Sequence, residues 1–126
     1  MQRFPADFLR TVATDVFSAC GAPREEASIV AEQLVASNLM GLDSHGVVMI
    51  PKYVGWVREG TTNPGAPVSV VSEEGGTAVI DCGLNFGQVG GRHARQLGAV
   101  LWRPTRNPLR IQFRRVVRAR SAATSR

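Results

Sequence analysis

Long hydrophobic runs and paired cysteines are both missing from this chain of 126 residues. No apolar run approaches the roughly 18 residues needed to cross a bilayer, and residues 1–5 lack the continuous apolar core of a signal peptide. We therefore expect a cytoplasmic protein without a membrane span. Cys20 and Cys82 stand far apart in the sequence, a spacing typical of neither a zinc site nor a disulfide framework. Both are predicted to be reduced thiols in the core.

Acidic residues are missing from the end of the chain. Residues 102–126 contain eight arginines and no Asp or Glu, whereas residues 1–101 contain seven basic and ten acidic residues. This break predicts one globular domain at 1–101 and a separate Arg-rich tail at 102–126. Like charges and two prolines favour a disordered tail, and the abrupt change of composition favours translation out of frame. A nucleic-acid-binding arm, which would contact phosphates, is the alternative.

Hydrophobic periodicity predicts two helices near the N-terminus. One follows Pro5 and ends at Gly21, and the second begins near Pro23, expected in its first turn, and ends at Gly41. Two acidic residues follow Pro23 and complement the positive end of the second helix dipole. The apolar stripes are Phe8, Leu9, Val12, Val16 and Phe17 in the first helix, and Ala27, Val30, Ala31, Leu34, Val35 and Leu39 in the second.

The pattern changes along the next forty residues. A third helix is predicted over 47–57, with Pro51 in its first turn or at a kink. β-Branched runs at 68–72 and 77–81 flank a Gly-Gly pair and predict a hairpin or two adjacent strands, and a fourth helix follows over 89–100. The order of three helices, two strands and a helix predicts an α+β fold, without the alternation of a doubly wound nucleotide fold.

The segment from Gly41 to Val47, Gly-Leu-Asp-Ser-His-Gly-Val, separates the second and third predicted helices and holds one of only two histidines. One interpretation is a cap, in which Asp43 or Ser44 accepts hydrogen bonds from the N–H groups that open the third helix. The other is a binding site, in which these N–H groups and Ser44 attract a carboxylate. His45 would then exchange a proton, because the ordinary pKa of histidine lies near neutrality. Spacing alone favours the cap.

These residues resemble the malate/L-lactate dehydrogenase family of the type 2 group, which includes ureidoglycolate and sulfolactate dehydrogenases. The resemblance covers residues 7 to about 100 in one register, as an N-terminal fragment of the family. Many relatives carry an arginine where Met49 stands, a residue suited to binding a substrate carboxylate, so the substrate stays open. The matching motifs are Gly41–Val47, Ile50–Val54, Gly60, Asn63-Pro64, Val70–Glu73, Thr77–Asp81 and Gly83–Gln88.

The resemblance implies an oxidoreductase that uses NAD or NADP to interconvert 2-hydroxy and 2-oxo acids. It further implies a non-Rossmann cofactor fold, in agreement with the missing G-x-G-x-x-G, and a homodimer when the protein is intact. His45 would be the catalytic acid-base residue, Ser44 would bind substrate, and Asp43 would shape the turn. No cofactor-binding residue is assigned. Much of the site would follow Leu101, so the chain is expected to be truncated and inactive alone.

Other residues give weaker evidence for a functional site. His93 stands between arginines on the fourth predicted helix and is interpreted as a solvated surface residue. With His45 it gives only two imidazoles, far apart in sequence, so no metal site is predicted. Three glycines of the same segment are attributed to close helix packing rather than to a phosphate loop: Gly87, Gly90 and Gly91. The nucleic-acid alternative depends on Arg103, Arg106, Arg110, Arg114, Arg115, Arg118, Arg120 and Arg126.

Overall fold

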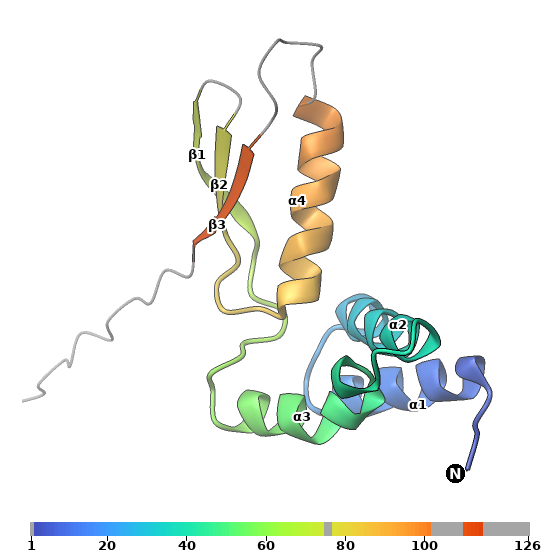
Figure 1. Ribbon diagram of the computed structural model, residues 1–126. Coiled ribbons are helices and arrows are strands. Elements are labelled where there is room, and N and C mark those ends of the chain that lie inside the picture. Colours follow the sequence, from blue (N-terminus) through green and yellow to red (C-terminus); the bar gives the residue numbers. More distant parts are fainter. Residues whose placement is uncertain (1, 75–76, 102–109, 115–126) are drawn as a thin grey trace, which may run out of the picture.

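The computed structural model describes residues 2–74, 77–101 and 110–114 (Figure 1). The helices that precede the sheet form a lower layer, and above it the strands stand beside the last helix. This order confirms the predicted α+β fold. The elements are α1 (Ala6–Ala19), α2 (Arg24–Leu39), the 3₁₀ turns η1 (Asp43–His45) and η2 (Val47–Met49), α3 (Ile50–Arg58), β1 (Ser69–Glu74), β2 (Thr77–Asp81), α4 (Gly87–Leu101) and β3 (Arg110–Arg114). In the described part of the chain no helix has the length and hydropathy of a membrane span.

The helix boundaries follow from prolines and glycines. Pro5 and Pro23 occupy the N-cap positions of α1 and α2 with extended backbones, so Pro23 lies just before the first turn rather than within it. Gly21 and Gly41 follow these helices at φ +97° and +79°, a left-handed conformation that ends a helix at little cost only for glycine. Pro51 lies in the first turn of α3, as predicted.

The core lies where α1, α2 and α3 meet the start of α4. Phe17 is fully buried, and its ring centroid lies 5.6 Å from Phe86 in an edge-on contact and 6.2 Å from Tyr53. These residues come from α1, α3 and the loop before α4, so one side chain joins three parts of the fold. The other buried apolar residues of this cluster are Ala13, Ala22, Ala27, Ile29, Val30, Ala31, Leu34 and Val89.

The predicted apolar stripes are partly wrong. Phe8, Val12 and Leu39 are 51%, 40% and 67% exposed. Helix α1 buries Phe17, as predicted, but its other buried residues are Ala13 and Thr14, so the contact face is turned away from Phe8 and Val12. Leu39 is the last residue of α2 and extends beyond the packed region. Apolar residues on both sides of the contact stripe made the buried face look wider in the sequence.

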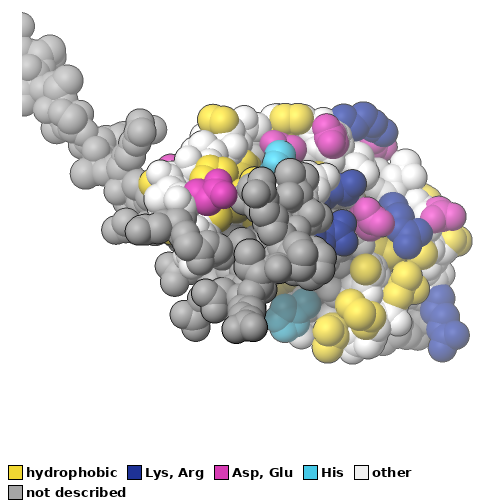
Figure 2. Space-filling view, turned by 90° about the horizontal axis from the view of Figure 1, so that it is seen from above, with side chains coloured by type: hydrophobic (Ala, Val, Ile, Leu, Met, Phe, Trp, Pro, Cys, Tyr) yellow, Lys and Arg dark blue, Asp and Glu magenta, His cyan; other side chains and the backbone are white. Residues whose placement is uncertain are grey.

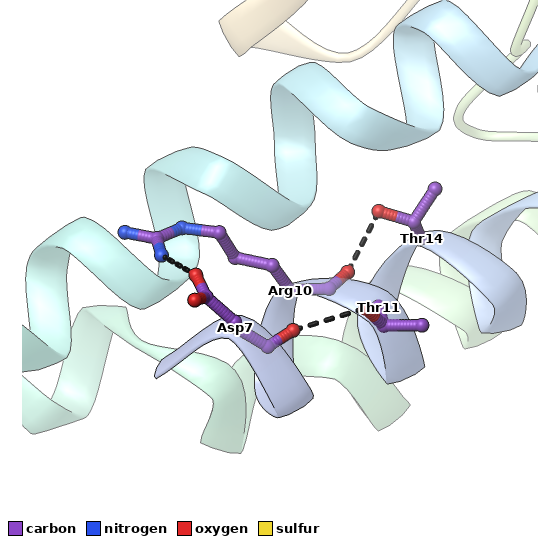
Figure 3. Close-up of polar contacts among 4 residues, drawn as sticks. All are labelled: Asp7, Arg10, Thr11 and Thr14. Carbon is purple, nitrogen blue, oxygen red and sulfur yellow. Dashed lines mark hydrogen bonds and ion pairs between the residues drawn. The ribbon is translucent and has the colours of Figure 1, made fainter. Parts of the chain in front are cut away.

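Thr14 shows how α1 buries a polar side chain. Its hydroxyl donates to the Arg10 carbonyl at 2.7 Å, and Thr11 makes the same contact with the Asp7 carbonyl at 3.0 Å (Figure 3). Arg10 is in turn paired with the Asp7 carboxylate at 2.6 Å. A threonine that bonds back to the fourth preceding carbonyl satisfies its own hydroxyl. Thr14 can therefore lie in the interface without an unpaired group.

The strands form one mixed sheet in the order β1-β2-β3. β1 and β2 are antiparallel, with Ser69 opposite Asp81 and an irregularity between Val70 and Ser72, which confirms the predicted strand pair. β3 runs parallel to β2, with Arg114 opposite Asp81. The expectation that the whole tail lacks regular structure is therefore wrong for Arg110–Arg114, because the edge of β2 offers a row of backbone partners. Tail residues 102–109 and 115–126 lie outside the described residues.

Glu26 joins the helical layer to the loop before α4. Its two carboxylate oxygens accept hydrogen bonds from the Gly65 N–H at 2.7 Å and the Asn85 side-chain amide at 2.9 Å. Asn85, buried, also donates to the Ala66 carbonyl at 3.1 Å and accepts from the Phe86 N–H at 2.7 Å. We call this group the Glu26 clasp. It fixes both segments that connect α3 to the sheet and the sheet to α4.

We expect Glu26→Ala to lower the free energy of unfolding by about 1–3 kcal/mol, because Gly65 and the buried Asn85 lose an acceptor. Urea denaturation of the full chain, followed by circular dichroism, measures it. Glu25→Ala is the matched control, since Glu25 is exposed and lies in the same first turn of α2. It should change the stability by less than about 1 kcal/mol. Equal losses in the two variants would show that the clasp contributes nothing beyond the helix dipole.

Candidate active site

The turn between α2 and α3 presents Ser44 and His45 together. Ser44 Oγ lies 3.0 Å from His45 Nδ1, within hydrogen-bond distance, and both side chains are exposed. The turn is closed by backbone bonds from His45 N to the Leu42 carbonyl at 2.9 Å and from Gly46 N to the Asp43 carbonyl at 3.1 Å. Because the hydroxyl and the imidazole can each donate or accept, the direction of their hydrogen bond follows the tautomer of the ring.

Asn38, in the last turn of α2, holds the far side of this turn. Its Oδ1 accepts from the Val47 N–H at 2.8 Å, and its Nδ2 donates to Asp43 Oδ1 at 2.6 Å. The expectation that Asp43 or Ser44 caps the third helix is therefore wrong: α3 has Met49 at its N-cap and no side-chain capping bond, and the Val47 N–H donates to Asn38. A side chain from the preceding helix takes the place of the cap. Asn38 was missed because it lies nine residues before its partner, outside any local capping pattern.

Gly46 is required by the close approach of Asn38. A Cβ atom at Gly46 would overlap the Asn38 side-chain amide, and Gly46 itself is buried. Its φ of −93° is open to any residue, so space and not backbone conformation demands glycine here. The side chain of Met49 packs against the hydrophobic core. Position 49 therefore supplies no charge for a substrate carboxylate.

A cleft of about 760 Å³ lies at the other end of α3, between that helix, the β2–α4 loop and the start of α4. Leu84 in its wall has φ +67°, a conformation that is uncommon outside glycine, and its carbonyl accepts the Asn63 N–H at 2.9 Å. Burial, and secondarily the neighbouring Asp81 carboxylate, raises the pKa of the Cys82 thiol. The thiol is therefore kept neutral and a poor nucleophile. The lining residues are Trp56, Glu59, Thr61, Thr62, Asp81, Cys82, Gly83, Leu84, Asn85, Gly87 and Gly91.

The structure changes the interpretation of two glycines and of both cysteines. Gly87 and Gly91 line it, and a Cβ at either would meet no atom within 4 Å, so close helix packing does not explain them. Cys20 and Cys82 are free, as predicted, but both are partly exposed rather than in the core.

The cleft does not fit a dinucleotide. Among its described lining residues the charged side chains are Glu59 and Asp81, both acidic, and carboxylates repel a pyrophosphate. No group of three or more His, Cys, Asp or Glu residues is placed to hold a metal ion in the part of the chain that the structure describes.

His93 lies on α4 and is exposed, as predicted for a surface residue. Figure 2 shows the histidine side chains as separate cyan patches. The described surface therefore does not unite the two imidazoles in one site.

Comparisons with known proteins agree with the fold. A family model described as malate/L-lactate dehydrogenase matches residues 4–103, and the chain belongs to this family. This confirms the resemblance found in the sequence. The match ends close to the change of composition after Leu101.

Three relatives illustrate the similarity. The chain is 38% identical over 96 residues to hydroxycarboxylate dehydrogenase B of Escherichia coli O157:H7, which covers 76% of this chain and 27% of that protein. It is 40% identical over 83 residues to L-sulfolactate dehydrogenase of Methanocaldococcus jannaschii, covering 66% and 24%. The structure of malate dehydrogenase from Pyrococcus horikoshii OT3 superposes with a TM-score of 0.73 at 35% identity, covering 76% and 28%. The chain spans about a quarter of the length of these relatives.

Proposed function

We propose that this chain forms part of an NAD- or NADP-dependent dehydrogenase that interconverts 2-hydroxy and 2-oxo acids. The observation that carries the proposal is the exposed Ser44–His45 pair, with 3.0 Å between Oγ and Nδ1, in a chain of the malate/L-lactate dehydrogenase family. The names of the relatives support a hydroxy-acid substrate, since they act on hydroxycarboxylates, sulfolactate and malate.

His45 is proposed as the acid-base residue and Ser44 as a substrate-binding residue. Oxidation of an alcohol removes the hydroxyl proton as hydride leaves the carbon. When His45 Nδ1–H donates to Ser44 Oγ, Nε2 keeps a lone pair that can accept this proton. The Ser44 O–H is then free to donate to a substrate oxygen. In the reverse reaction the imidazolium returns the proton to the carbonyl oxygen. The exposure of both side chains gives a substrate direct access to them.

The nicotinamide cofactor, when bound, accepts or supplies the hydride. The described residues offer it no phosphate-binding set, because the cleft beside α4 carries acidic groups, so we assign it no residue of this chain. For the same reason we propose that the 126-residue chain is inactive by itself. A homodimer is proposed from the family resemblance. A cytoplasmic location is proposed because two free thiols suit a reducing compartment.

We also propose that the change of composition near Leu101 marks a domain boundary. Residues 1–101 are taken as the dehydrogenase segment and residues 102–126 as a tail outside it. Translation of this tail out of frame would explain why arginine replaces the mixed charges of the preceding residues. Sequencing the gene tests this, since another reading frame should then encode continued similarity to the family.

A segment swap tests the enzymatic proposal. Residues 4–103 of this chain replace the matching segment of E. coli hydroxycarboxylate dehydrogenase B, and oxidation of NADH or NADPH is followed with a panel of 2-oxo acids. We expect turnover from this segment-swap enzyme and none from the 126-residue chain alone, because catalysis needs cofactor and substrate held together.

A second swap, limited to residues 36–60, guards against misfolding of the larger one, and circular dichroism checks that each is folded. Folded swaps without turnover on any 2-oxo acid would contradict the proposed function. Turnover by the purified chain alone would contradict the proposed dependence on further residues.

A further inference from the structure

We propose that Asn38 is a positioning residue, which holds the Ser44–His45 pair in its working geometry by bridging both ends of the turn. This inference deepens the proposed function and rests on it. Asn38 contacts neither Ser44 nor His45 in any hydrogen bond. It acts through Asp43, which directly precedes the pair, and through the Val47 N–H, which follows it after Gly46.

The turn has little else to hold its side chains. Residues 41–45 are all exposed, so packing does not fix them. Between residues 41 and 47, the two bonds of Asn38 are the side-chain hydrogen bonds that tie the described turn to a helix. The Ser44–His45 contact is made within the turn itself. Removing the Asn38 amide therefore leaves the pair supported by backbone bonds and by the packing of Val47 on the core.

The geometry uses both halves of the amide. Asn38 Oδ1 must accept from a backbone N–H, while Nδ2 must donate to a carboxylate, so neither a carboxylate nor an alanine at position 38 can make both bonds. Gly46 is part of the same arrangement, because any Cβ there would occupy the place of the Asn38 amide. Three residues of the turn, Asp43, Gly46 and Val47, are thus matched to one side chain of α2.

The amide of Asn38 and the carboxylate of Asp43 can be exchanged between the two positions. In the double variant Asn38→Asp with Asp43→Asn, the new carboxylate at 38 accepts from the Val47 N–H and from the amide now at 43. Both hydrogen bonds are restored: the bond between positions 38 and 43 has its donor and acceptor exchanged, and the Val47 N–H donates as before. The side-chain lengths are unchanged. Asn38→Asp alone places two carboxylates together at a contact that is now 2.6 Å and should disrupt the turn. Asp43→Asn alone keeps an acceptor for Asn38 and should be mild.

The deciding measurement is made on the full 126-residue chain by ¹⁵N relaxation. We expect backbone order parameters at Ser44 and His45 near about 0.85 in the unchanged chain, falling below about 0.6 in Asn38→Ala. The double variant should restore them. Glu26→Ala is the matched control, since it removes two hydrogen bonds from the same helix and should leave the order of the turn unchanged. If Asn38→Ala unfolds the chain, Asn38→Asp and its rescue by Asp43→Asn give the same comparison.

An ordered turn in the disrupted variant, failure of the double variant to restore order, or equal loosening by Glu26→Ala would each overturn the proposal. In the segment-swap enzyme, Asn38→Ala should lower kcat by about 10- to 100-fold with KM changed less than about threefold. Unchanged kcat there, despite a loosened turn, would also overturn it. If the unaltered swap has no turnover while the relaxation pattern holds, the proposed function fails and the hydrogen-bond bridge stands.

Discussion

Replacing His45 by alanine in the segment-swap enzyme is expected to lower kcat by about two to four orders of magnitude, the usual contribution of a general acid or base. The imidazole is exposed and contacts the Ser44 hydroxyl, so its removal opens no cavity in the core. Stability should therefore stay nearly constant. Steady-state kinetics with the best 2-oxo acid of the panel, paired with a thermal melt, separates the chemical effect from unfolding.

His93→Ala is the matched control for this experiment. It removes the other histidine of the chain, from an exposed position on α4, and is expected to leave kcat within about twofold. Ser44→Ala should mainly raise KM, since its proposed role is to donate to bound substrate. A His45→Ala enzyme with full turnover would return the motif to a purely structural role.

Much of the fold could be predicted because single residues at the helix ends determine where each helix begins and stops. Pro5 and Pro23 precede helices, and Gly21 and Gly41 follow them at positive φ. These residues restrict or relax the backbone by themselves, whatever packs around them. The strand pair was equally accessible, because β-branched residues flank two glycines. The buried face of α1 could not be predicted in the same way, since it depends on which side of α1 meets α2.

The hydrogen bonds that hold the candidate site could not be predicted from the spacing of residues in the sequence. Asn38 bonds to Val47 across a turn, and Glu26 bonds to Asn85, 59 residues away. The Asn38 contact exists only after the turn has closed, and the Glu26 contact only after the loop before α4 has packed on α2. Neither residue type is unusual in a helix. The pairing of β3 with β2 was missed for a related reason: a parallel strand joins an edge through distant backbone groups, which the arginine-rich composition of that segment conceals. Ser44 and His45 were found because their chemistry is local.

Phe17→Ala is expected to lower the free energy of unfolding by about 3–5 kcal/mol, the range for a buried phenylalanine. Phe17 is fully buried and its neighbours Tyr53 and Phe86 belong to separate parts of the fold, so no single side chain can move to fill the space. Domains are stable by only about 5–15 kcal/mol. The loss should therefore consume a large share of the stability, and urea denaturation of the full chain measures it.

Phe8→Ala provides the matched control for this prediction, because it deletes the same atoms from the same helix at a position that is 51% exposed. Its ring stacks on the exposed Phe4, with 5.8 Å between centroids, and its loss should cost less than about 1 kcal/mol. If Phe17→Ala is unfolded before urea is added, Phe17→Leu keeps most of the volume and allows the cost to be measured. Similar losses at positions 8 and 17 would mean that the contact of α1 with α3 and with the loop before α4 does not hold the layers together.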